Sequence, residues 1–166
     1  SASAKSFIEI GINDNTVNFF NIYRKSFNPK DYFNRLKKRK IDVITIKDDN
    51  YPLNLKEISD APIAIYVKGK IKSSDKQAVA IVGSRKMTAY GREVSSRFSS
   101  ELASFGLTIV SGLARGIDTE AHKGALSVGG RTLAVLGCGL DMVYPPENYK
   151  LAETIIENGA LISEYP

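Results

Sequence analysis

The chain has 166 residues, 43% of them hydrophobic, a size and composition that suit one α/β domain and exclude a disordered chain. No apolar run approaches the roughly 20 residues of a membrane helix, and the single cysteine, Cys138, excludes an intrachain disulfide, so we expect a cytoplasmic protein without a membrane partner. The net charge is +5, from 23 basic and 18 acidic residues, and residues 1–70 carry the whole excess, a balance that permits nucleic-acid binding without demonstrating it.

Residues 1–40 are predicted to form an N-terminal helical segment. Its first five residues carry no signal pattern and are left out of the fold prediction. The aromatic-rich stretch 5–27 is expected to be helical with a break around residues 11–15. A second helix should start at Pro29, because proline is favoured at the first helical position. It should end in the basic run 35–40, which is either a solvated helix end that complements the helix dipole or a path for a nucleic-acid backbone.

Residues 41–166 form the predicted main domain, which opens with two strands. Residues 41–46 (IDVITI) alternate between apolar and polar side chains, and residues 63–67 (IAIYV) form the second apolar run. A turn cluster lies between them at residues 48–52. The polar stretch 69–76 is the best candidate for a boundary along this part of the chain.

From residue 78 the chain repeats one pattern three times: an apolar strand, a small-residue turn and a helix. The strands are residues 78–82, 107–110 and 132–136, and a further one covers residues 160–163. This alternation predicts an α/β fold with a mainly parallel sheet and helices on both faces, extended by the N-terminal strands and helices. In the first helix Tyr90, Val94, Phe98 and Leu102 recur every fourth residue and predict its buried apolar face.

The three small-residue turns are the predicted binding site. The carboxyl ends of neighbouring parallel strands lie side by side, and ligands bind there. Glycines allow a ligand to approach the backbone, while amides and arginines can hold a phosphate. The alternative is a set of tight structural turns whose arginines pair with acidic neighbours. The candidate DNA- or phosphate-binding residues are Gly83, Ser84, Arg85, Lys86, Ser111, Gly112, Arg115, Gly116, Gly137 and Gly139.

Four residues near these turns receive separate predictions. Asp118 is expected to cap the helix that follows Gly116, because aspartate is favoured at helix starts. Tyr144, in a proline-bound loop at a strand end, is the candidate for base stacking. His122 is expected to make structural hydrogen bonds, because no nucleophile elbow signals a hydrolase triad. Cys138 is expected to be a packed, inert thiol.

The sequence predicts neither a catalytic residue nor a metal or cofactor. One histidine and one cysteine cannot fill a metal coordination shell. The turn at Gly137 and Gly139 lacks the third glycine of the dinucleotide fingerprint, so NAD binding is not expected. A nucleotide-sensing module, with a mononucleotide in the same anion pocket, remains an alternative.

Ordered matches to one family run through residues 41–166. They include Tyr51-Pro52, residues 61–69 (APIAIYVKG), 80–85 (AIVGSR), 111–118 (SGLARGID), 133–139 (LAVLGCG), Tyr144-Pro145 and 162–166 (ISEYP). In these stretches the sequence resembles the DNA-processing protein A family, also called DprA or Smf. A single glycine-rich turn is weak support for a family, whereas this many matches in order are specific.

The resemblance implies an extended Rossmann-like domain that binds single-stranded DNA without catalysis. It also implies loading of the RecA recombinase during natural transformation or recombination, and a homodimer. Arg85 matches an arginine of the family's DNA pocket. The family pattern continues beyond residues 163–166, so we expect this chain to be the front part of the domain, truncated at its C terminus. The alternative is a nucleotide-hydrolysing relative of the LOG phosphoribohydrolases, whose Pro-Gly-Gly-x-Gly-Thr motif is absent here.

Overall fold

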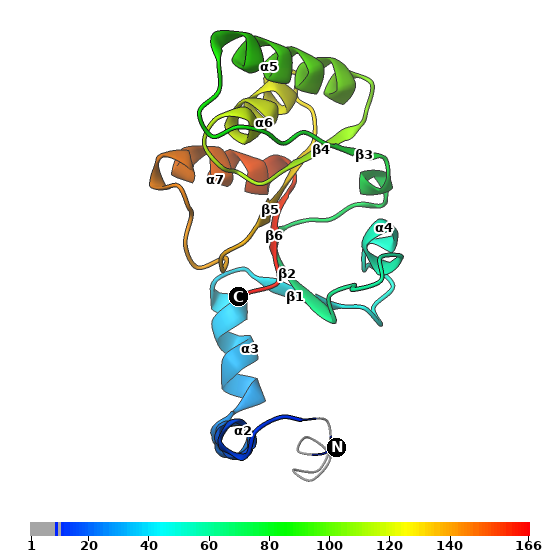
Figure 1. The fold of residues 1–166 in the computed structure, drawn as a ribbon. Helices are drawn as coiled ribbons and strands as arrows, with labels where there is room; N and C mark the ends of the chain where they lie inside the picture. Colours follow the sequence, from blue (N-terminus) through cyan, green and yellow to red (C-terminus); the bar gives the residue numbers. More distant parts are fainter. Residues whose placement is uncertain (1–8, 10) are drawn as a thin grey trace. The chain divides into compact units, whose positions relative to one another are not determined.

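The computed structural model describes residues 9 and 11–166, and the chain forms two compact units, Ser1–Arg35 and Leu36–Pro166 (Figure 1). In the first unit, helix α2 (Asp14–Ser26) begins after Asn13, whose side-chain oxygen accepts a hydrogen bond from the Thr16 amide at 2.9 Å. This start confirms the predicted break near residues 11–15. The five residues left out of the fold prediction lie outside the described part of the chain.

Helix α3 (Pro29–Lys38) starts at Pro29, as predicted, and ends in a left-handed residue. Lys40 has φ +56°, its amide donates to the Lys37 carbonyl, and the Ile41 amide donates to the Leu36 carbonyl, both at 3.0 Å. This pattern is a Schellman ending, in which the left-handed position is usually glycine. A side chain there costs about 1–2 kcal/mol of stability, so Lys40 occupies a position that glycine would fill with less strain.

The second unit is built on one six-stranded sheet with the order β1-β2-β6-β5-β4-β3. Strands β3 to β6 are parallel, whereas β2 is antiparallel to both β1 and β6. The sheet is therefore mainly parallel, and the predicted α/β fold class is confirmed. The strands are β1 (Asp42–Thr45), β2 (Ala64–Gly69), β3 (Ala78–Ala80), β4 (Thr108–Ser111), β5 (Thr132–Leu136) and β6 (Ala160–Ser163).

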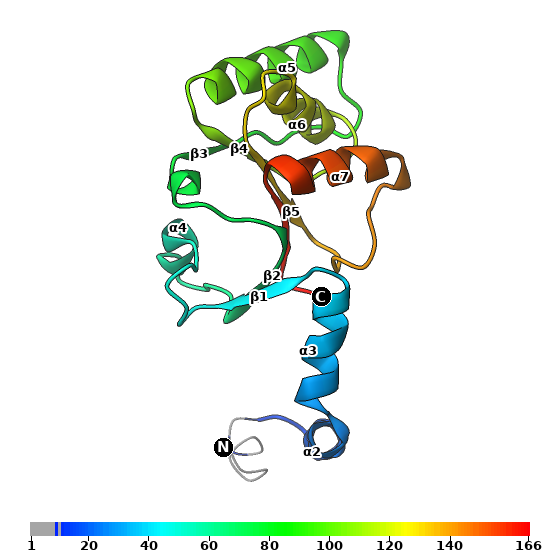
Figure 2. The same ribbon diagram turned by 180° about the vertical axis from the view of Figure 1, so that it is seen from behind.

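Helices cover both faces of this sheet. The helices are α4 (Leu53–Lys56), α5 (Ala89–Ser104), α6 (Ile117–Ser127) and α7 (Tyr149–Asn158), with 3₁₀ turns at Ser73–Lys76 and Pro146–Asn148. Helices α5, α6 and α7 connect successive parallel strands, and right-handed crossovers in this strand order place all three on one face. Helix α4 lies on the other face (Figures 1 and 2), where Tyr51 and Ile65 belong to one hydrophobic cluster and Leu55 packs against it. No helix in the described part of the chain is long and apolar enough to cross a membrane.

The polar connector 69–76 joins the sheet instead of dividing the chain. The strands on its two sides, β2 and β3, belong to the same sheet. Asp75 pairs with Arg131, which precedes β5, and accepts a hydrogen bond from the Thr108 hydroxyl at 2.9 Å. The prediction of a boundary here was wrong, because these polar side chains bind distant parts of the sheet and not only solvent.

The predicted buried face of α5 was right only in part, because Val94 and Leu102 are half-buried and Leu102 packs on the core, whereas the other two predicted residues are exposed. Tyr90 is 75% exposed and Phe98 is 50% exposed, whereas Ser95, Ser99 and Ala103 are the buried residues of the helix. The Ser99 hydroxyl donates to the Ala121 carbonyl of α6. Helices α5 and α6 approach backbone to backbone, because a Cβ on Gly124 would collide with the Ser96 carbonyl. Large side chains do not fit between helices this close, so small residues form the contact.

Candidate anion-binding site

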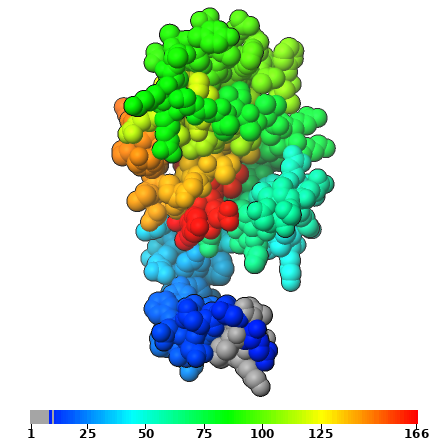
Figure 3. All heavy atoms as spheres, in the orientation of Figure 1, coloured from blue at the N-terminus to red at the C-terminus, as the bar shows by residue number. Residues whose placement is uncertain are grey.

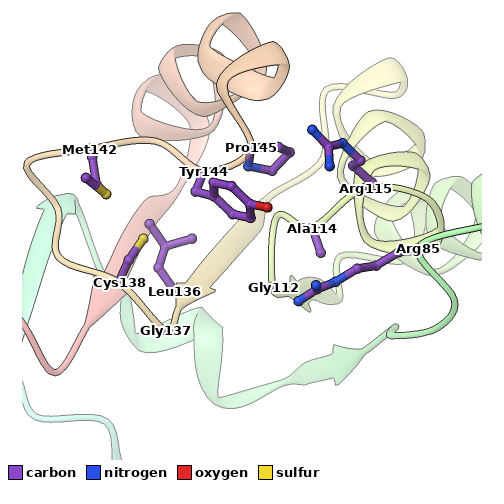
Figure 4. Close-up of a pocket in the computed structure, with 10 residues that line it drawn as sticks. All are labelled: Arg85, Gly112, Ala114, Arg115, Leu136, Gly137, Cys138, Met142, Tyr144 and Pro145. Atoms are coloured by element: carbon purple, nitrogen blue, oxygen red, sulfur yellow. The ribbon is translucent and has the colours of Figure 1, made fainter.

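All three small-residue turns contribute to one pocket of about 320 Å³ beyond the carboxyl ends of β4 and β5 (Figure 4). The pocket is lined by Arg85, Gly112, Ala114, Arg115, Leu136, Gly137, Cys138, Met142, Tyr144 and Pro145. Its lining includes residues predicted as site residues from every turn, and Tyr144, the predicted stacking residue. The remaining predicted residues shape the turns without lining the pocket: Gly83, Ser84, Lys86, Ser111, Gly116 and Gly139.

The turn that carries Arg85 is fastened to the turn that carries Arg115. The Ser84 hydroxyl accepts a hydrogen bond from the Lys86 amide at 3.1 Å and closes the first turn. The Ser84 carbonyl accepts from the Ile117 amide at 3.2 Å. Gly116 lies against that carbonyl with φ +81°, so a side chain there would be strained and would collide with it. Ser84 and Gly116 therefore set the spacing of the two arginine-bearing turns.

Asp118 organises the second turn from inside. Its buried carboxylate accepts hydrogen bonds from the Gly112 amide at 3.1 Å and the Ala114 amide at 3.4 Å. The N-cap of α6 is Gly116, so the predicted capping role of Asp118 was wrong. The turn at residues 112–114 lies close to the start of α6, so the Asp118 carboxylate in the first turn of this helix reaches the turn's amides. It holds the backbone that leads into Arg115.

Asn148 supports the same turn and was missed by sequence reasoning. Its side-chain nitrogen donates to the Leu113 carbonyl and the Thr119 hydroxyl, both at 2.9 Å. Leu113 is fully buried and has φ +59°, an unfavourable left-handed conformation for leucine. The anchors from Asp118 and Asn148 hold this strained residue in place. An asparagine two residues after the pair Pro145-Pro146 is the sequence signal that could have suggested a bridging role.

Arg115 has an acidic partner that the sequence analysis did not identify. Its guanidinium forms a two-point ion pair with Glu147, in which Nη2 donates to Oε2 at 3.1 Å. Hydrogen bonding to Glu147 raises the pKa of Arg115, and hydrogen bonding to Arg115 lowers the pKa of Glu147. Both side chains are about half exposed, 54% and 52%. Arg115 can therefore exchange its carboxylate partner for a phosphate without leaving water.

The wall opposite the arginines is open and partly apolar. A Cβ on Gly137 would meet no atom within 4 Å, so the backbone there is accessible to a ligand. Tyr144 is 56% exposed, and its ring stands over the pocket between Leu136 and the arginines (Figure 4). Cys138 is half-buried and lines the pocket, so the predicted packing of this thiol is only partial. The cysteine follows Gly137 into the open loop instead of pointing into the core.

Other predicted residues serve packing. Gly83 leaves room for Ile117, whose side chain would lie 2.8 Å from an added Cβ. Ser111 is buried, and its hydroxyl donates to the Ile81 carbonyl at 2.6 Å. Gly139 lies against the backbone of Pro166, and Figure 3 shows these last residues beside the loop that follows β5. Lys86 is exposed outside the pocket.

His122 does not line this pocket. His122 is fully buried, and its Nδ1 lies 2.7 Å from the Thr132 hydroxyl, in agreement with the predicted structural role. Within residues 9 and 11–166, no three His, Cys, Asp or Glu side chains are grouped to hold a metal ion. The site offers guanidinium groups, backbone and one aromatic ring, which is the chemistry of anion and base recognition.

The fold and site define a class: a Rossmann-like domain whose strand-end turns present arginines around an open pocket. Comparison with known proteins gives the family. Residues 42–166 match the model of the DNA recombination-mediator protein A family. The chain belongs to this family, whose members are also called DprA or Smf.

Individual members of the family are similar to this chain in sequence and in structure. Protein Smf of Synechocystis is 41% identical over 147 residues, which cover 86% of this chain and 37% of that protein. The crystal structure of DNA processing protein A from Streptococcus pneumoniae superposes with a TM-score of 0.80 at 36% identity and covers 99% of this chain and 57% of that one. A Helicobacter pylori DNA processing protein A structure, described as showing a single-stranded DNA binding mode, has a TM-score of 0.66 at 34% identity, over 76% of this chain and 56% of that one. The chain thus spans between about a third and three fifths of these relatives.

Proposed function

We propose that this chain binds single-stranded DNA without sequence preference, as a non-catalytic component of DNA processing and recombination. The observation that carries the proposal is the position of Arg85 and Arg115, which come from different turns and border one pocket with Tyr144. Two guanidinium groups suit a phosphodiester, and an exposed aromatic ring suits a base. The single-stranded DNA binding described for the Helicobacter pylori relative supports the same ligand.

A phosphate in this pocket would be held by two guanidinium groups that come from different turns. Arg85 and Arg115 supply the positive charge, and the open backbone at Gly137 leaves room for the sugar-phosphate chain. Contacts to the backbone carry no sequence information, so binding would tolerate any base sequence. Tyr144 is the one aromatic side chain of the pocket lining, so most bases of a bound strand would stay available to a second protein.

The proposal includes partners and the absence of catalysis. Bases left exposed on the bound strand suit delivery to the RecA recombinase, which we propose as the partner in loading. The sheet ends at β3, an edge strand that a second copy could cover, and we propose a homodimer for the longer protein. His122 is buried and outside the pocket lining, and the Ser111 hydroxyl is bound to a carbonyl, which supports binding without catalysis.

Removing either pocket arginine is expected to weaken single-strand binding about tenfold, because a hydrogen bond to a charged group is worth roughly 1.5–3 kcal/mol. The variants are Arg85→Ala and Arg115→Ala, with Arg97→Ala as the matched control on the exposed side of α5. The measurement is fluorescence anisotropy of a labelled oligo-dT of about 30 nucleotides, at two salt concentrations, beside a duplex of equal length. Affinity that is unchanged in both pocket variants would remove the assignment.

A mononucleotide is the second candidate ligand, favoured by the pocket's volume of about 320 Å³, which is in the range of small-molecule sites. This candidate covers both a nucleotide sensor and a nucleotide-hydrolysing enzyme. Thermal stabilisation by mononucleotides, together with no stabilisation by oligo-dT, would favour it. Stabilisation by oligo-dT alone would exclude it.

Glu147→Gln is expected to raise the affinity for oligo-dT about threefold. The substitution removes the carboxylate that pairs with Arg115 and would repel a phosphate at the rim of the pocket. An ion pair between exposed side chains is weak, which limits the gain to this size. Anisotropy titrations at low salt measure it, and a decrease in affinity would show that Glu147 positions Arg115 for binding instead of competing for it.

A further inference from the structure

A second hollow lies at the opposite end of the sheet from the arginine pocket. Its volume is about 720 Å³, and it is formed where β2 ends and where β5 and β6 begin. Four lysines line it, and we call it the lysine cleft: Lys40, Lys68, Lys70 and Lys72. Gly69, Gly129, Gly130 and Gly159 also line it, and a Cβ on Gly129 would meet no atom within 4 Å.

The lysine cleft has an excess of positive charge, and its lysine ammonium groups are not used in ion pairs with the described residues. Asp42 and Glu157 are the acidic residues of its lining, against four lysines. In the part of the chain that the structure describes, none of the four lysines forms an ion pair. Arg131 also lines the cleft, but its guanidinium is engaged by Asp75 and by the carbonyls of Lys70 and Asn158. The lysines are therefore the free cations of this surface.

Lys40 adds an independent observation. It lies in the left-handed conformation that ends α3, with φ +56°, at a position where glycine would be unstrained. A backbone outlier of this kind is an observation from which a functional role of the side chain can be hypothesised. Here the strained residue contributes a lysine to the lining of the cleft. The last residue of the basic run 35–40 thus faces the same hollow as three lysines from β2 and the connector after it.

We propose that the lysine cleft is a second binding site for the phosphate backbone of single-stranded nucleic acid, separate from the arginine pocket. The inference rests on the proposed function for the choice of ligand. Lysines bind phosphates as point charges without demanding a fixed geometry, and a wide cleft with four of them suits a flexible backbone. The five residues of β5 separate the two sites, so one phosphate cannot occupy both, and a strand that fills both must wrap around the domain.

Amide chemical-shift mapping distinguishes the two sites in one experiment. Unlabelled oligo-dT of about 30 nucleotides is titrated into the ¹⁵N-labelled chain, and the amides of Gly69 and Gly130 report on the cleft. The amides of Gly112 and Gly137 report on the pocket. Shifts at both pairs support both proposals, and shifts at the cleft pair alone support the cleft while refuting the pocket. Shifts at the pocket pair alone, or at neither pair, overturn the lysine cleft.

Charge removal tests the same inference by affinity. Lys68→Gln with Lys72→Gln should abolish the cleft shifts, leave the pocket shifts, and make the slope of log affinity against log salt shallower by about 1.4, which is 0.7 for each lost phosphate contact. The matched control, Lys47→Gln with Lys56→Gln, removes the same charge from outside both sites. An equal change of slope in the two double variants would show only a general charge effect and would overturn the proposal.

Lys40→Gly separates binding from stability. Relief of the left-handed strain should raise the melting temperature by about 3 °C, while loss of the ammonium group should lower the affinity for oligo-dT about twofold to threefold. A variant that is more stable and binds more weakly supports the role of Lys40 in the cleft. A variant whose affinity is unchanged refutes that role.

Discussion

Replacing Arg131 by methionine is expected to lower the free energy of unfolding by about 3–5 kcal/mol, the cost of leaving one member of a buried ion pair without its partner. The Asp75 side chain is only 6% exposed and that of Arg131 only 16%. Arg131 also donates to the carbonyls of Lys70 and Asn158, so one side chain ties the connector, α7 and the start of β5 together. Urea denaturation of parent and variant at neutral pH measures the loss.

The loss of stability should come from the Asp75 carboxylate, which is left buried without a cationic partner, and not from the missing arginine itself. Burial has the largest single effect and raises the pKa of Asp75, but the hydrogen bonds from Arg131, the Lys72 amide and Thr108, together with the charge of Arg131, outweigh it, so the net pKa is lowered. Without Arg131 only the cost of burial and weaker hydrogen bonds remain. The double variant Asp75→Leu with Arg131→Met should therefore lose less stability than the two single variants added together. A single Arg131→Met variant that loses less than about 1 kcal/mol would show that the pair is solvated.

The repeating part of the fold could be predicted from sequence because local pattern decides it. Strands β5 and β6 begin and end where the apolar runs do, and the proline at position 29 marks the start of α3. Two errors came from contacts that no local pattern records. The polar connector 69–76 binds Arg131, which is far away along the chain. The buried face of α5 follows from the close approach of α6 at Gly124 and not from the apolar period within α5.

The candidate site was predictable in its turns but not in its partners. The rule that strand-end loops converge brought Arg85, Gly112, Arg115, Gly137 and Tyr144 to one pocket. Asp118 lies within the same motif, whereas Glu147 is 32 residues from Arg115 and Asn148 is 35 residues from Leu113, so no local pattern links them to the turn. For the basic run 35–40 the sequence allowed either a solvated helix end or a path for a nucleic-acid backbone. The lysines that line the same cleft as Lys40 support the path for a nucleic-acid backbone.

His122 is placed so that the folded protein resists its protonation. The Thr132 hydroxyl donates to the Ile109 carbonyl at 2.8 Å, so it can only accept from His122, whose Nδ1 therefore carries the proton. Nε2 is buried without a hydrogen-bond partner. A proton on Nε2 would create a buried cation whose new N–H group has no acceptor. Burial accordingly lowers the pKa of His122 from 6.5 to about 4.

This histidine is expected to destabilise the protein in mild acid. Above pH 6.5 the imidazole is neutral in both the folded and the unfolded chain, and its stabilising effect does not depend on pH. Between pH 6.5 and about 4 the unfolded chain binds a proton that the folded chain refuses, so stability falls as the pH falls. The loss from this group should be about 2 kcal/mol at pH 5 and about 3 kcal/mol at pH 4. Urea denaturation at pH 7 and pH 5 measures it.

A His122→Gln variant isolates this effect from the titration of carboxylates. Glutamine can still donate to the Thr132 hydroxyl, but it has no group that titrates, so it keeps the hydrogen bond and removes the linkage. The variant will be less stable than the parent at pH 7 if packing suffers, yet the difference between pH 7 and pH 5 should shrink by about 2 kcal/mol. The comparison therefore concerns the change in unfolding free energy between the two pH values and does not depend on the absolute stability of either protein. Equal losses between pH 7 and pH 5 in parent and variant would mean that His122 takes up its proton in the folded state, which requires that water reaches Nε2.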